Sequence, residues 1–303
     1  MVAELYIIAE SFAYNADFSK EQVEEKVKGL SKDFIEIRKH QPFNRIFVHP
    51  DIYNIPFVQN IPLSTLLFDP IESKKIIDRD VYNALQKIIV ESAITSITSE
   101  EVISVLLPEH NENICHGLIA FHAIPGIDEH LQIVYNISDW YRFRRYFLGL
   151  YPKNPSHFIE ECNIYFPGLF FHEENKNSIG SILGECPRKI IYHLSALNDN
   201  FKRFYTFPYN RTIALKEFSI YSNLDEAASP EGNPERKLEL TFKFLNDAGI
   251  LEDVYCEPHM KLCFTDNYPG DRSYSTDRRI YFHEGKANIH ENKILVGHIG
   301  RHL

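Results

Sequence analysis

Residues 4–52 read ELYIIAESFAYNADFSKEQVEEKVKGLSKDFIEIRKHQPFNRIFVHPDI, and this stretch decides the fold of the first half of the chain. Its two ends, ELYII at 4–8 and NRIFVHPDI at 44–52, are typical of strands. Between them, Ser19 and Gln22 have the spacing of a capping box, which predicts a helix that continues to about Arg38. The order strand, helix, strand predicts an α/β arrangement for the N-terminal half.

Alternating helical and strand patterns continue to about residue 150. The sequence predicts, in order, a helix over 78–94, a short helix after the capping box at 98–101, strands over 115–124 and 130–137, and a helix over 139–150. Three prolines then interrupt the pattern within residues 152–178, which places a domain boundary near Tyr151. We therefore expect residues 1–151 to form an N-terminal α/β domain, most simply a docking or sensing module.

The second half begins with helical patterns and ends with strand patterns. Pro187 occupies the position of a first helical residue, and the polar residues 222–236 are predicted to form a mobile loop. Strands are predicted at KLELTFKFL (237–245), RRIYFH (278–283) and KILVGHI (293–299), the last two as an antiparallel hairpin. We expect residues 152–303 to form a helical segment followed by a small antiparallel sheet. The fold class predicted for the whole chain is α+β, or mixed α/β.

The composition is that of a folded globular protein. The chain has 303 residues, of which 44% are hydrophobic, and a formal net charge of −10. This charge excludes the broad basic surface that nonspecific DNA coating needs, and it suits a protein that docks on a basic protein partner. No stretch of ~20 apolar residues occurs and the N-terminus lacks a signal-peptide pattern, so we expect no membrane segment and a cytoplasmic location.

The five cysteines are scattered, and no CxxC pair occurs among them. Cys256, His259 and Cys263 are close in sequence, but their spacing is not that of a familiar zinc site. We expect buried free thiols in a reducing compartment. The sequence also lacks Walker, GxGxxG, GxSxG and HExxH motifs, so neither a metal nor a cofactor is predicted.

Residues 259–303 differ from the rest of the chain in charge and in histidine content. They hold five of the 14 histidines, and seven Lys or Arg residues against five acidic residues. An imidazole can gain or lose a proton near neutral pH, and a guanidinium can bind a phosphate through two hydrogen bonds. This composition therefore indicates a phosphate-directed site that works without a metal.

The alternation of side chains along a strand predicts how these residues are presented. Arg279, Tyr281 and His283 share one face of their strand and are expected to face solvent or substrate, while Ile280 and Phe282 face the core. On the last strand, the same rule places His298 with the apolar residues at 294 and 296. If the preceding segment is extended, the side chains at 259 and 261 also share a face.

These residue types suit the cleavage of RNA. A base must take the proton of the 2′-hydroxyl, a cation must neutralise the phosphate, and an acid must protonate the leaving oxygen. We predict as catalytic residues His283, His298 and Tyr281, and as substrate-binding residues Lys261, Arg279, Arg301 and His259. In this prediction the imidazoles of His283 and His298 form the acid–base pair, and Tyr281 positions the RNA.

The segment RRIYF (278–282) followed by KILVGHIGRHL (293–303) resembles the terminal strands of the RelE/ParE toxin superfamily. Ribosome-dependent members of that superfamily cleave mRNA with basic and aromatic residues on this sheet. The resemblance implies that role for Lys261, Arg279, Tyr281 and His298. The chain departs from the superfamily in its greater length, its acidic charge and the longer loop GKANIHEN between the two strands.

Two further segments combine basic residues with histidine or aromatic residues. Arg188 and His193 resemble the motif of HEPN ribonucleases, although five residues on an ideal helix place them about 140° apart. The helix predicted at 139–150 interleaves Arg with Phe and Tyr, as some proteins that bind single-stranded nucleic acids do. An ordinary amphipathic helix explains it as well, and we then expect Arg144 and Arg145 on the outside.

Two functions of different class follow from these patterns. The first is a toxin-like, metal-independent ribonuclease effector in a bacterial defence or toxin–antitoxin system, with RNA as its partner. The second is a non-enzymatic interaction or assembly subunit, or a regulator, whose acidic surface binds another protein. Convergence of the histidines and arginines in an open cleft would favour the first function, and burial of the same residues would favour the second.

Overall fold

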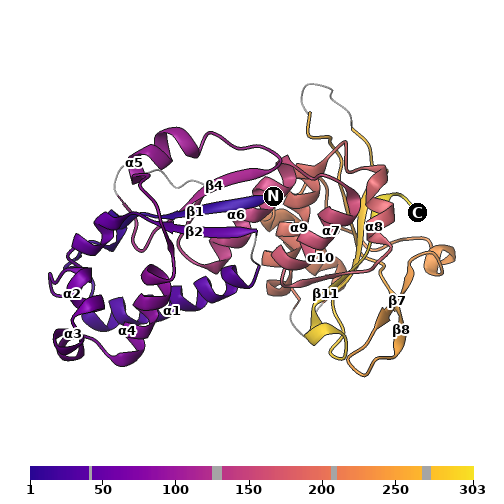
Figure 1. Ribbon diagram of the computed structural model, residues 1–303. Helices are drawn as coiled ribbons and strands as arrows, with labels where there is room; N and C mark the ends of the chain where they lie inside the picture. The colour runs from indigo at the N-terminus through magenta and orange to yellow at the C-terminus, as the bar shows by residue number, and fades with distance from the viewer. Residues whose placement is uncertain (41–42, 125–131, 206–209, 268–273) are drawn as a thin grey trace. The chain divides into compact units, whose positions relative to one another are not determined.

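A computed structural model describes residues 1–40, 43–124, 132–205, 210–267 and 274–303 (Figure 1). The chain forms two compact units, Met1–Arg144 and Arg145–Leu303. A parallel sheet lies in the first unit, and helices and small antiparallel sheets form the second, which confirms the mixed α/β class. The division falls within one helix, seven residues before the boundary that the prolines indicated.

The first unit contains a parallel sheet with strand order β3-β2-β1-β4-β5. Its strands are β1 (Val2–Ile7), β2 (Asn44–Val48), β3 (Ala93–Ile94), β4 (Ile114–Ile119) and β5 (Ile133–Val134). Its helices are α1 (Lys20–Lys39), α2 (Leu63–Phe68), α3 (Pro70–Ile76), α4 (Arg79–Leu85), α5 (Ser99–Glu101) and α6 (Ile137–Leu150), the last of which continues past Arg144. The capping box that predicted α1 is present, with Ser19 and Gln22 each bonded to the other's backbone.

Side chains from both faces of this sheet are buried. On one face, Tyr6 and Leu118 pack with Val102 of the segment that follows α5. On the other, Gly117 lets α6 approach closely, because a Cβ at this position would lie 2.9 Å from both Leu5 Cδ2 and Phe143 Cε2. Parallel strands covered on both faces have the apolar character that the sequence showed at 4–8 and 115–121.

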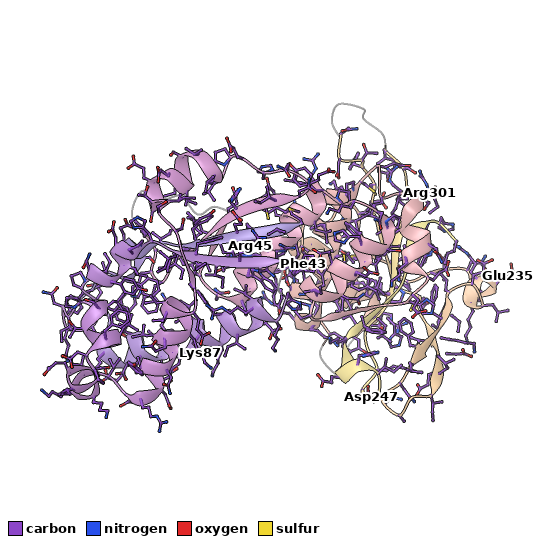
Figure 2. All side chains as sticks on the ribbon, viewed as in Figure 1. Phe43, Arg45, Lys87, Glu235, Asp247 and Arg301 are labelled. Atoms are coloured by element: carbon purple, nitrogen blue, oxygen red, sulfur yellow. The ribbon has the colours of Figure 1, made fainter. Side chains whose placement is uncertain are left out.

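The second unit is built on a four-stranded sheet with strand order β6-β11-β10-β9. The strands are β6 (Leu169–Phe171), β9 (His259–Lys261), β10 (Arg278–His283) and β11 (Ile294–Arg301), of which only β6 and β11 pair in parallel. A separate hairpin joins β7 (Thr241–Leu245) to β8 (Leu251–Tyr255). Figure 2 labels Asp247 in the turn of this hairpin and Glu235 in the segment before it. The helices are α7 (Pro155–Tyr165), α8 (Asn175–Ser178), α9 (Pro187–Asn200) and α10 (Arg211–Tyr221).

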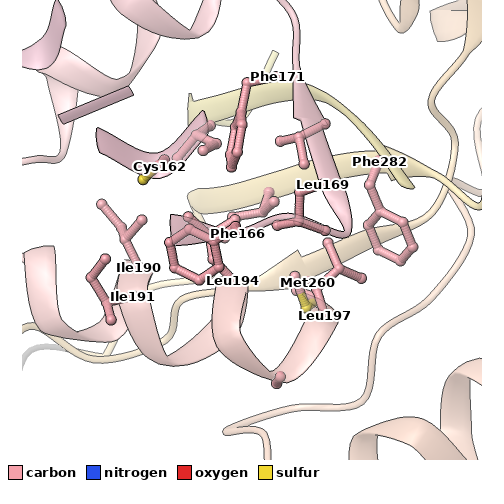
Figure 3. Packing of buried hydrophobic residues seen from close by; sticks show 14 of the residues in the cluster. Cys162, Phe166, Leu169, Phe171, Ile190, Ile191, Leu194, Leu197, Met260 and Phe282 are labelled. Carbon is pink, nitrogen blue, oxygen red and sulfur yellow. The ribbon is translucent and has the colours of Figure 1, made fainter. Parts of the chain in front are cut away.

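The four-stranded sheet is buried on both faces. Ile190, Leu194 and Leu197 of α9 pack against one face, where they contact Met260 and Phe282 in a large apolar cluster (Figure 3). The opposite face packs against the β7–β8 hairpin in a second apolar cluster. It contains Leu240, Phe242, Phe244, Val254, Cys256, Tyr281, Ile289 and Leu295. Helices on one side and a hairpin on the other therefore enclose the predicted site strands.

Several predicted elements differ in extent from the structure. Where one helix was predicted over 78–94, the structure has α4, then a π-helical turn at Gln86–Val90, and then strand β3 at Ala93–Ile94. The strand predicted at 237–245 begins only at Thr241, because Pro234–Lys237 form a 3-10 turn. The strand predicted over 130–137 is observed as β5, and its residues 130 and 131 lie outside the described residues.

Two arginines of α6 that were expected on the solvent-facing side of this helix are buried instead. Arg144 donates a hydrogen bond to the carbonyl oxygen of Met1 at 3.1 Å. Arg145 donates to the carbonyl oxygen of Tyr165 at 2.7 Å and forms an ion pair with Asp199 at 2.8 Å. Both guanidinium groups thus satisfy backbone carbonyls in the interior, which an amphipathic pattern does not reveal. Within the described residues, the structure contains no helix that is long and apolar enough to cross a membrane.

Candidate functional site

Strand register brings three predicted site residues into one row across the sheet. Tyr281 of β10 pairs with His259 of β9 on one side and with His298 of β11 on the other. The ring centroids of Tyr281 and His259 are 5.1 Å apart, and those of Tyr281 and His298 are 6.1 Å apart. In the neighbouring row, Arg279 pairs with Lys261. Cross-strand pairing therefore assembles a tyrosine between two imidazoles, next to two cationic side chains.

A β-bulge at Gly297 sets the direction of His298. Tyr281 pairs with His298 but Phe282 pairs with Val296, so Gly297 is an extra residue in β11. A Cβ at Gly297 would lie 2.6 Å from the ring of Phe242, which belongs to the hairpin face. His298 follows on that same face, beside Tyr281. The expectation that His298 shares a face with the apolar residues at 294 and 296 is therefore wrong, because the bulge interrupts the alternation.

The face that carries these residues is covered, and this corrects the expectation that it meets solvent. Tyr281 is 0% exposed, His259 4% and His298 5%. The β7–β8 hairpin packs on Tyr281, and the segment 229–236 lies over the polar side chains. This segment was predicted to be a mobile polar loop, whereas in the structure it holds a carboxylate against the sheet.

That carboxylate belongs to Glu231, which gathers four side chains around it. Arg279 and Arg236 approach its Oε2 through Nη1 at 3.3 Å each, and the hydroxyl of Tyr281 donates to it at 3.4 Å. His302 Nε2 lies 4.0 Å from the same oxygen. Arg279 also donates to the Tyr281 hydroxyl at 3.0 Å. We call the group formed by Glu231, Arg236, His259, Arg279, Tyr281, His298 and His302 the Glu231 cluster.

Two buried atoms of the Glu231 cluster have no hydrogen-bond partner among the described residues. They are Nδ1 of His259 and Nη2 of Arg236. Most buried polar atoms in folded proteins are paired, so these two nitrogens stand out within the cluster. Both of these atoms are donors or acceptors of the kind that a phosphate or ribose group would meet.

His283 is not part of the cluster. It extends from the other end of β10, where its Nδ1 accepts a hydrogen bond from the backbone N–H of Gly285 at 3.0 Å and its Nε2 lies 4.0 Å from Glu284. In the register of the sheet it pairs with Leu295, whereas His298 pairs with Tyr281. The pairing of His283 with His298 as acid and base finds no geometric support.

The cations predicted to bind phosphate are already paired with acids. Lys261 contacts Glu226 at 2.6 Å. Arg301 contacts Glu185 and also Asp277, the latter at 3.3 Å. Glu226 and Glu185 come from outside the terminal segment and offset its excess of positive charge. The basic face expected from the sequence is therefore an ion-paired surface in this conformation.

Burial lowers the pKa of all three imidazoles in the Glu231 cluster, those of His259, His298 and His302. It lowers the pKa of His259 from 6.5 to about 4, with a smaller contribution from the charge of Arg279. It also lowers the pKa of His298, although the hydrogen bond between His298 Nε2 and the carbonyl oxygen of Arg301, at 2.9 Å, opposes this. Burial alone would raise the pKa of Glu231, but the charge of His259, which exists only once its ring is protonated in acid, and that of Arg236 outweigh it, and the net shift is downward. At neutral pH the cluster thus holds neutral imidazoles and an ionised carboxylate.

A pH dependence of stability follows from His259. Because its pKa in the folded protein lies below 6.5, folding favours the neutral ring. Its contribution to the free energy of unfolding is fully present above pH 6.5 and decreases as the pH falls towards 4. Between about pH 7.5 and about pH 5, we expect urea unfolding to show a larger loss of stability for the wild type than for His259→Asn. Titration of the His259 ring near its ordinary pKa, followed by NMR, would contradict this.

The other predicted motifs have structural explanations. His193 is fully buried and its Nδ1 bonds to the carbonyl oxygen of Lys189 at 2.9 Å, while Arg188 pairs with Asp266 at 3.3 Å. All five cysteines are buried and unbridged. Among the described residues, no group of three or more His, Cys, Asp or Glu side chains is arranged to hold a metal ion.

Sequence reasoning missed Glu231 and Arg236, the two cluster residues outside the terminal segment. Both lie in the polar stretch 222–236, and nothing in its local pattern indicates that it folds onto the sheet. Comparison of the chain with protein-family models, with curated proteins and with solved structures found no match. The candidate site therefore depends on the geometry of the Glu231 cluster alone.

Proposed function

We propose that the C-terminal unit is a toxin-like, metal-independent ribonuclease effector whose site is the Glu231 cluster and whose resting form is closed. The observation that carries this proposal is the environment of the Glu231 carboxylate. Two guanidinium groups, a tyrosine hydroxyl and an imidazole surround it. Such donors bind phosphate in the same way as they bind a carboxylate. Glu231 thus occupies the place where an RNA phosphate would bind.

The chemistry of the cluster suits proton transfer, with roles that differ from those expected from the sequence. His298 is neutral and donates its Nε2–H to the carbonyl oxygen of Arg301, so its Nδ1 can accept the proton of a 2′-hydroxyl. The pKa of Tyr281 is raised by burial, so its hydroxyl keeps the proton that the leaving oxygen needs. Arg279 and Arg236 then neutralise the phosphate as its charge grows. Entry of RNA requires that segment 229–236 moves away from the sheet.

The test compares the purified wild type with Glu231→Gln on labelled RNA in the presence of a chelator. Loss of the carboxylate removes the ion pairs with two arginines, which favours the open segment. We expect Glu231→Gln to cleave RNA at least about tenfold faster than the wild type, which corresponds to about 1.4 kcal/mol. A second change, Tyr281→Phe in the Glu231→Gln background, should return the rate to that of the wild type.

Asp225→Asn is the matched control for Glu231→Gln. Its carboxylate is ion-paired with Lys189 and its side chain is 13% exposed, compared with 12% for Glu231, but it lies outside the cluster. We expect it to leave the rate unchanged. If Glu231→Gln keeps its circular dichroism spectrum and still cleaves no RNA, the cluster is a structural network and the ribonuclease function is wrong.

A second function is favoured by a different observation, the apolar turn of the β7–β8 hairpin. Leu245 and Leu251 pair across the hairpin and are 51% and 60% exposed, and the neighbouring Ile250 is 62% exposed. Exposed apolar residues grouped in this way are typical of surfaces that bind other proteins. A non-enzymatic interaction subunit would use this turn, and Leu251→Asp would then remove the protein from its complex in cells.

A further inference from the structure

The parallel sheet of the first unit reverses its direction of winding between β1 and β4. From β1 the chain adds β2 and β3 on one side, and then adds β4 and β5 on the other. In sheets of this kind, ligands bind beyond the carboxyl ends of the two strands at which the order reverses. Here those ends are Ile7 of β1 and Ile119 of β4.

The two segments that follow these strand ends are joined by hydrogen bonds. Ser11, which is buried, accepts a hydrogen bond at Oγ from the backbone N–H of Phe121 at 2.9 Å and donates to the carbonyl oxygen of Ile8 at 2.6 Å. The N–H of His122 donates to the carbonyl oxygen of Ser11 at 3.2 Å. His122 is therefore held at the switch point by backbone contacts.

His122 meets a lysine and two aromatic rings at this place. Lys26 of α1 places its Nζ 3.2 Å from His122 Nδ1 and 5.0 Å from the centroid of the Phe121 ring. The imidazole is stacked on Phe18, with centroids 4.5 Å apart and planes 17° apart. Because an ammonium group only donates, Nδ1 accepts, and the remaining ring proton lies on Nε2. Lys26 and His122 together thus present N–H donors next to an aromatic surface.

The charge of Lys26 is not matched by an acid in the described part of the chain. Arg38 and Lys189, by contrast, form ion pairs with Glu91 and Asp225. Burial lowers the pKa of Lys26, and burial followed by the charge of Lys26 lowers the pKa of His122 to about 4. A half-buried ammonium group without a counter-charge is unfavourable, and a bound anion would offset this cost.

The loop between β1 and α1 limits the type of anion. Residues 8–19 contain no glycine, so the backbone cannot approach a pyrophosphate as the glycine-rich loops of dinucleotide-binding proteins do. The N-terminus of α1 is also less available to an anion, because the side chain of Ser19 in the capping box already accepts a hydrogen bond from the backbone N–H of Gln22. A single anionic group held by side chains fits these constraints. Phe18 is 39% exposed, so it offers a flat surface next to the donors.

We propose that the switch point of the first unit binds a nucleoside monophosphate, with its phosphate on Lys26 and His122 and its base on Phe18. This site is independent of the Glu231 cluster and of the proposed ribonuclease function. A phosphate monoester supplies the missing negative charge, and the base supplies the flat ring that stacks on an aromatic side chain. Docking or sensing by this unit would then depend on a small nucleotide.

The test is calorimetric titration of the full-length protein with adenosine monophosphate, inorganic phosphate and adenosine. We expect adenosine monophosphate to bind more tightly than the other two. Lys26→Met should weaken this binding by about tenfold or more, which is the loss of one charge-assisted contact. Phe18→Ala should weaken the nucleotide but leave inorganic phosphate unchanged. The control is Lys32→Met, which removes an exposed lysine from the same helix and should change nothing.

The outcomes separate the proposal from its alternatives. Equal binding of the nucleotide to the wild type and to Lys26→Met, or no binding at all at millimolar concentration, would overturn it. Binding of inorganic phosphate as tightly as of the nucleotide, unaffected by Phe18→Ala, would show a simple phosphate site and overturn the role of the base. Since Lys26 is half-buried, circular dichroism of each variant must first match that of the wild type.

Discussion

Phe282→Ala is expected to destabilise the C-terminal unit by about 3–5 kcal/mol. Phe282 is fully buried in the apolar cluster between α9 and the four-stranded sheet, and its ring packs against Phe201 with centroids 5.3 Å apart at 83°. Removal of the ring loses its burial and leaves a cavity that α9 and β10 cannot close, because both are held by other contacts. Urea unfolding, with hydrogen exchange followed segment by segment, measures the loss and locates it.

Phe282→Leu and Leu238→Ala serve as controls for this change. Leucine keeps most of the volume, so the loss should be less than half of that for alanine. Leu238 is 87% exposed and its replacement should change the free energy of unfolding by less than about 0.5 kcal/mol. A loss below about 1 kcal/mol for Phe282→Ala would mean that this cluster does not hold the sheet and α9 together.

Gly297→Ala is expected to destabilise the same unit by about 1–3 kcal/mol through overpacking. The added Cβ would lie 2.6 Å from Cδ2 of Phe242 and 2.9 Å from Sγ of Cys256. An aromatic ring packed in the hairpin cluster cannot turn away, so either β11 or the hairpin must shift. Such a shift would also move His298, the next residue, away from Tyr281.

The control for Gly297→Ala is Gly184→Ala, since a Cβ at Gly184 would meet no atom within 4 Å. It should be neutral or slightly stabilising, because alanine restricts the unfolded chain more than glycine does. Thermal unfolding of both variants, together with NMR of the His298 ring, distinguishes the two sites. Equal stability of both variants would mean that the hairpin does not pack on β11 as described.

Local signals in the sequence predicted much of the fold correctly. The capping box at Ser19 begins α1, Pro187 begins α9, and the two terminal patterns form the antiparallel pair β10 and β11. Each of these signals acts within a few residues, so the chain near it is sufficient to reveal it. The bulge at Gly297 and the burial of Arg145 are different, because each results from segments distant in sequence packing together.

Local signals in the sequence also predicted one part of the candidate site. The other part depends on contacts between segments that are distant in the sequence. Alternation and register were enough to anticipate that Tyr281 and Arg279 share a face, and β9 brings His259 next to them. The acids that neutralise the cations, such as Glu226 for Lys261, lie in loops whose path depends on tertiary packing. Because the prediction did not include these acids, it made the terminal segment more basic and more open than the structure shows.

The parallel pairing of β6 with β11 has a consequence for synthesis of the chain. β11 lies between β6 and β10, so the sheet cannot form until residues 294–301 have left the ribosome. At typical rates of translation, Phe171 therefore waits on the order of ten seconds for its strand partner Val296. During this interval the apolar faces of α7 and α9 have no sheet to cover them and are available to chaperones. The Glu231 cluster, which needs β9, β10 and β11 together, is consequently assembled only after residues 294–301 have been made.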